Sequence, residues 1–474
     1  MKLYNTATRQ IEKFKPITPG RASIYSCGPT VYWHQHLGNL RKDIMDDLLR
    51  RVLTYNGYTV YSVKNLTDVG HLTNDDEDQG DDKMEAAAKK ENLTATQIAE
   101  KYTQAWREDD TKLNVTDFAH YPKATEYIQE QINLIKRLEK KGFTYVISDG
   151  VYFDTSKLPE YADFAKLDME NLRAGARVDM GEKKNPTDFA LWKFSEQPGV
   201  RQQEWESPWG IGFPGWHSEC VVMSDALLHT PFDIHTGGKE HVAIHHTNEI
   251  AQVKADTGHH MANYWVHSYH LTIDGAKMSK SKGTIVTMDE LIAKGYDPLE
   301  YRLLMLMAHY RTDTDLSWKA LDQAKATLKR LREFVDRVSR QPHQKNQDIQ
   351  WNLKKLEKTF RNHVSNDLDT PKALAAIFDF VRETNARIDA GEPILKRHII
   401  KAFIKFDRVL GLDLVPDPRS EDTQIPEEIL QLAKDRDQAR ADKDYTKADT
   451  LRDQLQTLGF EVKDTPQGTV VTKK

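Results

Sequence analysis

A strand, a turn, a helix and a second strand follow one another within residues 22–63, and this order constrains the fold more than any other feature of the sequence. Residues 22–26 are β-prone and lead into Gly28-Pro29, which predicts a buried strand that ends in a turn. Apolar residues then recur at helical spacing from Ile44 to Val52, and residues 58–63 predict the second strand. Because this unit builds parallel sheets, we expect an α/β fold.

Further domains are predicted around this unit. An Asp-rich stretch, two helices and a segment of β character indicate an insertion at about residues 74–200 within an α/β domain of residues 1–265. Residues 266–311 connect this domain to an α-helical bundle at 312–415, because the pattern from about residue 298 to the linker is helical, with one apolar face that runs from Leu321 to Val338. A linker rich in Pro, Asp and Ser at 416–426 precedes a small α+β domain at 427–474, made of two helices and a hairpin.

Composition excludes some classes of protein. The chain has 474 residues, and no uncharged apolar run approaches the roughly 20 residues that a membrane-spanning helix needs, so we expect no membrane partner and a cytoplasmic location. The formal net charge of −5 means that any nucleic-acid binding must use local basic faces. The only two cysteines are Cys27 and Cys220, and a disulfide is a poor default for them without a secretory signal.

Two short motifs suggest a nucleotide site. His36-Leu37-Gly38-Asn39 stands between the first strand and its helix, where helix N–H groups favour phosphate, Gly38 permits close approach, and His36 and Asn39 can donate hydrogen bonds. Lys277-Met278-Ser279-Lys280-Ser281 places two lysines among small hydroxylic residues, which suits a loop that closes on a triphosphate. Each motif alone has a plainer interpretation, as a helix-entry turn with a surface histidine and as a solvated basic loop.

Together, an HxGN turn and a later KMSKS loop resemble the paired signature of class I aminoacyl-tRNA synthetases. Within that class the chain resembles the cysteinyl-tRNA synthetases, in segments spread from its first residues nearly to its end. These segments are residues 27–32, 214–220, 232–235, 245–249, 366–371 and 464–469. The resemblance implies a Rossmann-type parallel sheet with an inserted domain, followed by the helical bundle and the C-terminal domain. It also implies a monomeric cysteine–tRNA ligase that uses ATP with Mg²⁺ to activate L-cysteine as its adenylate and transfers it to tRNA(Cys).

The resemblance implies one zinc ion (Zn²⁺) per chain, held by Cys27, Cys220, His245 and Glu249. The residues themselves agree, because His245 and Glu249 stand four apart and would face the same way on a helix. Two thiolates, an imidazole and a carboxylate are a plausible zinc set, and zinc would bind a substrate thiol as thiolate where a hydroxyl binds poorly. The alternative is that both cysteines are small buried core residues.

The remaining site residues are expected from the same resemblance. Catalysis would use His36, Asn39, Lys277 and Lys280; ATP would also contact Gly38 and Ser279; and the substrate pocket would include Thr67, Trp216 and His235. The basic residues of the helical region and of the C-terminal domain become candidates for tRNA contact only through the resemblance.

Several positions depart from the commonest family pattern, which suggests a divergent subgroup or a specialised second copy. They are Trp33, residues 68–71 including Gly70, residues 236–239 beginning with Thr236, and Thr247. Two rival functions also follow. An ATP-dependent ligase that joins cysteine to an amino sugar has the same catalytic fold but lacks the long C-terminal part. A non-catalytic RNA-binding paralogue would have no need of the intact motif residues.

Overall fold

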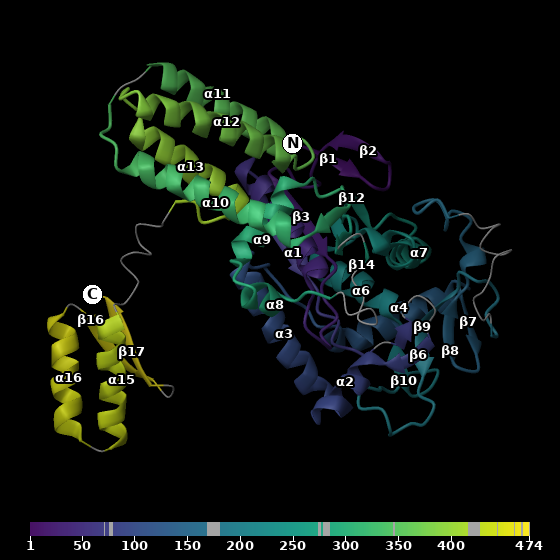
Figure 1. Cartoon of the computed structure of the whole chain (residues 1–474). Coiled ribbons are helices and arrows are strands. Elements are labelled where there is room, and N and C mark those ends of the chain that lie inside the picture. The colour runs from purple at the N-terminus through teal and green to yellow at the C-terminus, as the bar shows by residue number, and fades with distance from the viewer. Residues whose placement is uncertain are drawn as a thin grey trace. The chain divides into compact units, whose positions relative to one another are not determined.

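The chain forms two compact units, residues 1–412 and 413–474, in a computed structural model (Figure 1). The structure describes residues 1–70, 72–74, 79–167, 181–273, 276–277, 285–344, 347–415, 427–442, 444–458, 460–465 and 468–473. The linker expected at 416–426 lies outside these described residues. No helix among them is long and apolar enough to cross a membrane.

A sheet of four parallel strands lies at the centre of the first unit, in the order β12-β11-β3-β4. The strands are β3 (Arg21–Ser26), β4 (Thr59–Lys64), β11 (Phe232–Gly238) and β12 (Ala262–Ser268). The first strand–helix–strand unit of the sequence therefore forms as predicted, and the α/β fold is confirmed.

The order of the strands creates a switch point between β3 and β11. From β3 the chain passes through α1 (Leu37–Tyr55) to β4, whereas from β11 it passes through α7 (His245–Thr257) to β12 on the other side. Right-handed crossovers in opposite directions place these two helices on opposite faces of the sheet. Ligands of open parallel sheets bind where such connections diverge, at the carboxyl ends of the strands.

A large insertion separates β4 from β11. It contains a hairpin, several helices and a second sheet, which is antiparallel and has the order β10-β9-β8-β7. Its strands are β5 (Leu72–Asn74), β6 (Gln79–Asp82), β7 (Thr144–Ile147), β8 (Gly150–Phe153), β9 (Phe189–Phe194) and β10 (Gly212–Pro214), and its helices are α2 (Lys83–Glu91), α3 (Ala95–Lys112) and α4 (Ile128–Lys140). The antiparallel sheet thus continues past residue 200, where the sequence predicts that the insertion ends, because β10 pairs with β9. The three residues of β10 show no strand pattern in the sequence.

After the insertion, α6 (Trp216–Leu228) brings the chain back to the central sheet, where it contacts β3. A small sheet follows β12, in which β13 (Leu271–Ile273) pairs with β14 (Ala276–Lys277) and with β15 (Thr314–Leu316). The prediction of a continuous helical pattern between about residue 298 and the linker is therefore wrong at β15. Three residues that pair with a strand about forty positions earlier leave no periodic signal in the sequence.

Most of the remaining first unit is helical. It consists of α8 (Met288–Ala293), α9 (Pro298–Met307) and a bundle of α10 (Trp318–Ser339), α11 (Gln347–Val364), α12 (Thr370–Asp389) and α13 (Lys396–Leu410), which lie side by side in Figure 1. The apolar face predicted along the first of these helices, from Leu321 to Val338, is buried. At the chain's start, β1 (Lys2–Asn5) and β2 (Gln10–Lys13) form a hairpin, and β1 lies beside β12.

The second unit contains two helices and a hairpin, as predicted. These are α15 (Glu427–Ala441), α16 (Tyr445–Thr457), β16 (Phe460–Thr465) and β17 (Gly468–Lys473). Its small core gathers Ile429, Ala433, Leu455, Phe460 and Val471. A core of its own indicates that this unit folds independently.

A buried ion pair fastens the central helix α1 to the helical region. Asp47 of α1 and Arg302 of α9 are both fully buried, with 2.6 Å between Oδ2 and Nη2. The same carboxylate accepts from Arg51 Nε at 2.6 Å and from the backbone N–H of Thr116 at 3.0 Å. Arg302 also donates through Nε to the carbonyl of Leu410 at 2.7 Å. Four distant segments of the first unit therefore meet at one carboxylate and its arginine.

Replacing Asp47 with asparagine is expected to lower the free energy of unfolding by about 3–5 kcal/mol at pH 7, because Arg302 would stay buried without its charged partner. Burial opposes ionisation of Asp47, but Arg302, Arg51 and Arg50 outweigh burial and hold its pKa well below the usual range. The carboxylate therefore contributes stability above its unfolded pKa of about 3.9, and this contribution is lost as the pH falls through the lower folded pKa.

Urea denaturation of both proteins between pH 3 and 8 checks this expectation. The difference between wild type and Asp47→Asn should be constant above about pH 5 and should shrink in acid. Asp117→Asn is a matched control, since that side chain is 77% exposed and its ion pair with Arg107 lies at the surface. A difference below about 1 kcal/mol at pH 7, or one that grows in acid, would contradict the role given to Asp47.

Candidate active site

Four metal-binding side chains converge at the switch point of the central sheet. Cys27 follows β3 directly, Cys220 lies in α6, and His245 and Glu249 lie one turn apart at the start of α7. All four are at least 95% buried. The Sγ atoms of the cysteines are 4.0 Å apart, Cys220 Sγ is 3.7 Å from His245 Nε2, and His245 Nε2 is 3.0 Å from Glu249 Oε1. The four donor atoms all lie within 4.8 Å of one another.

This donor set fits a zinc ion. Tetrahedral zinc with Zn–S near 2.3 Å and Zn–N or Zn–O near 2.0–2.1 Å places its ligand atoms about 3.3–3.8 Å apart. Four of the six separations between the donor atoms are 3.0 to 4.0 Å, close to this range, and all six are within 4.8 Å. Without a cation, two thiols and a carboxylate would be buried together at considerable cost. The chemistry and the geometry of the four residues are thus compatible with zinc.

The electrostatics of the cluster show how strongly its groups are coupled. Burial opposes the charged form of His245, but the Glu249 carboxylate and Cys27 outweigh it and raise the pKa of His245 to about 10. Burial likewise opposes ionisation of Glu249, yet His235 and His245 hold the pKa of this carboxyl well below its usual range. A bound cation would take the place of the proton on His245, so metal binding should release protons.

A second donor set overlaps the first. His235 and His246 lie within 4.8 Å of Cys27 and Glu249, with His246 Nε2 at 3.2 Å from Cys27 Sγ and His235 Nε2 at 3.0 Å from Glu249 Oε2. The sequence alone does not indicate a role for His246. His246 directly follows His245 on the helix, and successive residues of a helix point about 100° apart. The spacing of these residues therefore does not predict that both histidines contact the same cluster, and only the fold shows that His246 lies next to Cys27.

Further histidines orient these candidate ligands. His217 Nδ1 lies 3.1 Å from His245 Nδ1, and His267 Nε2 lies 2.8 Å from His246 Nδ1. Each contact is made by the ring nitrogen that faces away from the cysteines. Such partners fix the tautomer of a histidine and the direction in which its other nitrogen points.

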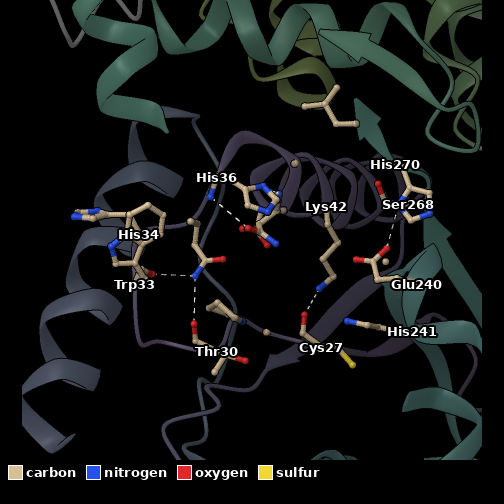
Figure 2. Close-up of a pocket in the computed structure, with 18 of the residues that line it drawn as sticks. Cys27, Thr30, Trp33, His34, His36, Lys42, Glu240, His241, Ser268 and His270 are labelled. Carbon is tan, nitrogen blue, oxygen red and sulfur yellow. Dashed lines mark hydrogen bonds and ion pairs between the residues drawn. The ribbon is translucent and has the colours of Figure 1, made fainter. Parts of the chain in front are cut away.

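One cavity of about 420 Å³ joins the cysteine cluster to the HxGN turn. Figure 2 shows Cys27 and His241 at one side of this cavity, Trp33 and His34 at the other, and His36 between them at its upper edge. Trp216 lines the cavity beside Cys27, and its ring centroid is 4.3 Å from that of His245. A molecule in the cavity can therefore contact Cys27 of the donor set and the HxGN turn at the same time.

The three expected substrate-pocket residues are placed differently from one another. Trp216 forms part of the cavity wall, whereas Thr67 and His235 are not among the described residues that line it. Thr67 is 2% exposed and donates to Glu219 Oε2 at 2.8 Å. His235 is fully buried behind Glu249, where it stacks on Trp265 with 4.5 Å between ring centroids. In this arrangement His235 supports the metal donors, and direct substrate contact by either residue stays a prediction.

The HxGN residues begin helix α1 and cap it. His36 is the N-cap residue, and its Nδ1 accepts from the backbone N–H of Asn39 at 3.2 Å, while Asn39 Oδ1 accepts from the N–H of His36 at 3.3 Å. A neutral imidazole that accepts through Nδ1 carries its proton on Nε2 and can donate it to phosphate. His36, Gly38 and Asn39 all line the cavity.

The KMSKS motif begins at the end of β14, of which Lys277 is the last residue. The side chain of Lys277 and all of Ser279 and Lys280 lie outside the described residues. The chain on the far side of the motif returns to α1, where the N–H of Leu37 donates to the carbonyl of Val286 at 2.9 Å. The chain that follows the KMSKS motif is therefore anchored at the HxGN turn.

Lys42 is a cavity residue that the sequence analysis missed. Its Nζ donates to the carbonyl oxygen of Cys27, a contact drawn as a dashed line in Figure 2. The same Nζ forms an ion pair with Asp46 Oδ2 at 2.8 Å. It belongs to no short motif, and a lysine on an amphipathic helix is usually solvated. Only the contact with a candidate ligand marks it.

Comparison with known proteins gives consistent matches along the chain. The family described as "tRNA synthetases class I (C) catalytic domain" matches residues 13–326, a DALR domain matches 359–415, and the "Cysteinyl-tRNA ligase anticodon binding domain" matches 422–471. A cysteine–tRNA ligase 1 from Burkholderia lata is 44% identical, with 99% of this chain and 96% of the relative covered. A cysteine–tRNA ligase from Treponema denticola is 39% identical, with 98% of each covered.

The fold is also similar to that of solved class I synthetases. The structure of Mycobacterium tuberculosis methionyl-tRNA synthetase bound by methionyl-adenylate has a TM-score of 0.61 and 15% sequence identity, covering 83% of this chain and 92% of that one. At this identity the likeness concerns the fold alone, and it confirms the class I synthetase architecture expected from the sequence. The catalytic-domain family matches residues 13–326, and the relatives match over nearly their whole length. This chain therefore belongs to the cysteinyl-tRNA synthetase family.

Proposed function

We propose that this protein is a cysteine–tRNA ligase, which activates L-cysteine with ATP and Mg²⁺ and transfers the cysteinyl group to tRNA(Cys). The observation that carries the proposal is the single cavity between the Cys27 cluster and the HxGN turn. At about 420 Å³ it can accommodate an amino acid joined to a nucleotide, with the two ends in different chemical surroundings. The names of the full-length relatives agree with this assignment.

Within this cavity the chain's own residues bind and orient two substrates. Cys27, Cys220, His245 and Glu249 would hold Zn²⁺, which when bound supplies a Lewis-acid site that recognises the substrate's sulfur as thiolate. Trp216 would wall the amino-acid end. His36 and Asn39 would donate hydrogen bonds to the triphosphate, so that the cysteine carboxylate and the α-phosphate meet with pyrophosphate leaving. Lys277 and Lys280 would neutralise charge that develops as pyrophosphate departs.

Metal recognition explains how cysteine could be separated from serine. A simple apolar pocket discriminates between close analogues by only about 1–3 kcal/mol. A thiol that coordinates zinc is deprotonated, whereas the hydroxyl of serine is a poor ligand for the same ion. The selectivity then comes from the strength of a metal–ligand bond, and no separate editing domain is needed.

The C-terminal half favours a tRNA substrate over an amino sugar. The second unit, residues 413–474, coincides with the match to the anticodon-binding domain family at 422–471. We assign tRNA binding to the helical bundle at 312–415 and anticodon contact to residues 427–474, with 416–426 as their linker. We further propose that the enzyme acts as a monomer in the cytoplasm. A non-catalytic paralogue is disfavoured because the donor set and the HxGN turn are both intact.

Zinc content tests the donor set. The purified protein should hold one zinc per chain, measured by plasma mass spectrometry after dialysis, and Cys220→Ala or His245→Ala should each lose most of it. His246→Ala should keep it, because His246 belongs only to the second donor set. Ser224→Ala is the control, since Ser224 is also small and buried and lies one turn further along the same helix. Full zinc in Cys220→Ala, or its loss in His246→Ala alone, would assign the site to the second set instead.

Cysteine-dependent exchange of pyrophosphate into ATP tests the activation step. Zinc-loaded wild type should catalyse it with cysteine and far less with serine, and Lys280→Ala should lower kcat by about 10²–10³-fold with a smaller change in the KM for ATP. The reason is that Lys280 would act on charge that appears only in the transition state. No exchange by the zinc-loaded wild type would refute the proposed function. A raised KM with unchanged kcat in the variant would refute only the role of Lys280.

Removing residues 416–474 separates activation from charging. Pyrophosphate exchange should stay within about twofold of wild type, because the cavity and the donor set lie entirely within residues 1–412 and a domain with its own core can be removed intact. The efficiency of tRNA charging should fall, and the dependence of tRNA affinity on salt should become less steep as phosphate contacts are lost. Equal charging by the two proteins at matched salt would show that the second unit does not bind tRNA.

A further inference from the structure

A buried arginine next to the HxGN turn makes contacts that the catalytic assignment does not use. Arg41 lies on the first turns of α1, two residues after Asn39, and is 3% exposed. Its Nη1 donates to the carbonyl oxygen of His270, and its Nη2 donates to the carbonyl oxygen of Thr312 at 2.6 Å. One rigid guanidinium thus holds two backbone segments that are far apart in the sequence.

Both segments lead into the small sheet that carries Lys277. His270 immediately precedes β13, which pairs with β14, and Thr272 stands opposite Lys277 in that pairing. Thr312 stands shortly before β15, which is the other neighbour of β13. The carbonyl of His270 also accepts from the N–H of Thr314 at 3.1 Å. Arg41 therefore hydrogen-bonds to the backbone beside the start of β13 and beside the start of β15, in the small sheet that contains Lys277.

The far side of the motif is attached to the same turn of α1. Leu37 donates its N–H to the carbonyl of Val286, and His36 forms an antiparallel bridge with Thr287. Tyr301 of α9 donates its hydroxyl to the carbonyl of Leu37 at 2.7 Å. The segments before and after residues 278–284 thus both hydrogen-bond to the start of α1. On the Lys277 side, Arg41 makes these hydrogen bonds.

The segment that Arg41 holds is also fixed from behind. Asp367, between α11 and α12, is 2% exposed and accepts from Tyr310 Oη at 2.6 Å and from Arg311 Nε at 2.8 Å. Asp367 and Leu368 both have positive φ, at 59° and 55°. Two consecutive residues in this conformation are strained and persist only where their surroundings fix them. The carbonyl of Thr312 therefore offers Arg41 a rigid partner.

Burying the charge of Arg41 is expected to lower the free energy of unfolding, and its hydrogen bonds to neutral groups compensate only in part. In the described part of the chain it belongs to no ion pair, and its hydrogen-bond partners are neutral carbonyls. A buried charge without an ionic partner is usually less stable than a packed apolar side chain of similar volume. By contrast Arg50, on the same helix, makes a similar fork to the carbonyls of Thr116 and Asp117 but has Asp47 3.5 Å away.

We propose that Arg41 is a positioning residue for adenylate formation. Its fork sets the separation between the HxGN turn and the strand pair that ends at Lys277, so that both motifs meet the same triphosphate. This proposal rests on the proposed function, because it assumes that both motifs act on ATP. Displacement of a reacting group by about 1 Å can cost about 10²-fold in rate, which is large enough to explain why a buried arginine stands at this position.

Arg41→Met tests the proposal, because methionine fills much of the same volume but cannot donate hydrogen bonds. In cysteine-dependent pyrophosphate exchange its kcat should fall by about 10²-fold, while the KM for cysteine and the zinc content stay within about twofold of wild type. Arg41→Lys keeps the charge and can reach only one carbonyl at a time, so an intermediate kcat is expected. Wild-type kcat in both variants would overturn the proposal, whereas inactivity of the wild type itself would instead refute the proposed function.

Arg50→Met is the matched control, because it removes a fork to two carbonyls from the opposite end of the same helix. Its kcat for exchange should stay within about threefold of wild type even where its melting temperature falls. Hydrogen–deuterium exchange provides a readout that does not depend on activity. Arg41→Met should accelerate deuterium uptake by the backbone of residues 269–273 and 312–316. Arg50→Met should accelerate deuterium uptake around residues 114–119.

A purely structural role for Arg41 would give a different result. Its variants would then lose activity only in proportion to their loss of folded protein, and Arg50→Met at equal stability would be equally impaired. Equal kcat for Arg41→Met and Arg50→Met, or unchanged deuterium uptake in residues 269–273 of Arg41→Met, would overturn the assignment of Arg41 as a positioning residue.

Discussion

The charged inner face of helix α1 is the constraint on which the rest of the first unit depends. Asp43 and Asp46 hold the fully buried Lys64 of β4, and Asp47 holds the fully buried Arg302 of α9. Burying so many charges is favourable only when every partner is present, because any one of them left alone would be strongly destabilising. The network therefore fixes how α1 lies against both the sheet and the helices, and α1 in turn begins with the HxGN turn that borders the cavity.

The position of the metal donors follows from the topology of the central sheet. Cys27 leaves β3 at the switch point, while His245 and Glu249 belong to the crossover helix that follows β11, so the sheet brings together residues more than 200 positions apart. Thr236, one of the departures from the commonest family pattern, has a structural role. Its hydroxyl donates to Asp46 Oδ1 at 2.6 Å and joins β11 to the charged network of α1. The departure thus changes a structural contact and leaves the donor set untouched.

Elements with a local pattern could be predicted from the sequence, and long-range contacts could not. The helices show an apolar periodicity of 3.6 residues, and the predicted face along α10 from Leu321 to Val338 is buried. The parallel strands appear in the sequence as short β-prone runs, because both faces of their sheet are covered. The strand β15 and the last strand of the antiparallel sheet are three residues long and are defined only by their partners. Likewise, His246 and Arg41 stand next to recognised motif residues, but what each of them contacts depends on chain segments that sequence spacing cannot locate.

The two ends of the cavity pose opposite physical problems, and the structure separates them. The sulfur end would need a buried cation that lowers the pKa of a substrate thiol, and Cys27, Cys220, His245 and Glu249 form a donor set that could hold one. Of these four residues, Cys27 is the one among the described residues that line the cavity, which Trp216 also lines. The phosphate end needs donors that keep their geometry while charge moves. Helix α1 contacts both ends of the cavity, because Lys42 donates to the carbonyl of Cys27 while His36 caps the helix at the HxGN turn. One helix therefore links the candidate metal donors to the HxGN turn, so a change in its position would affect both ends of the cavity together.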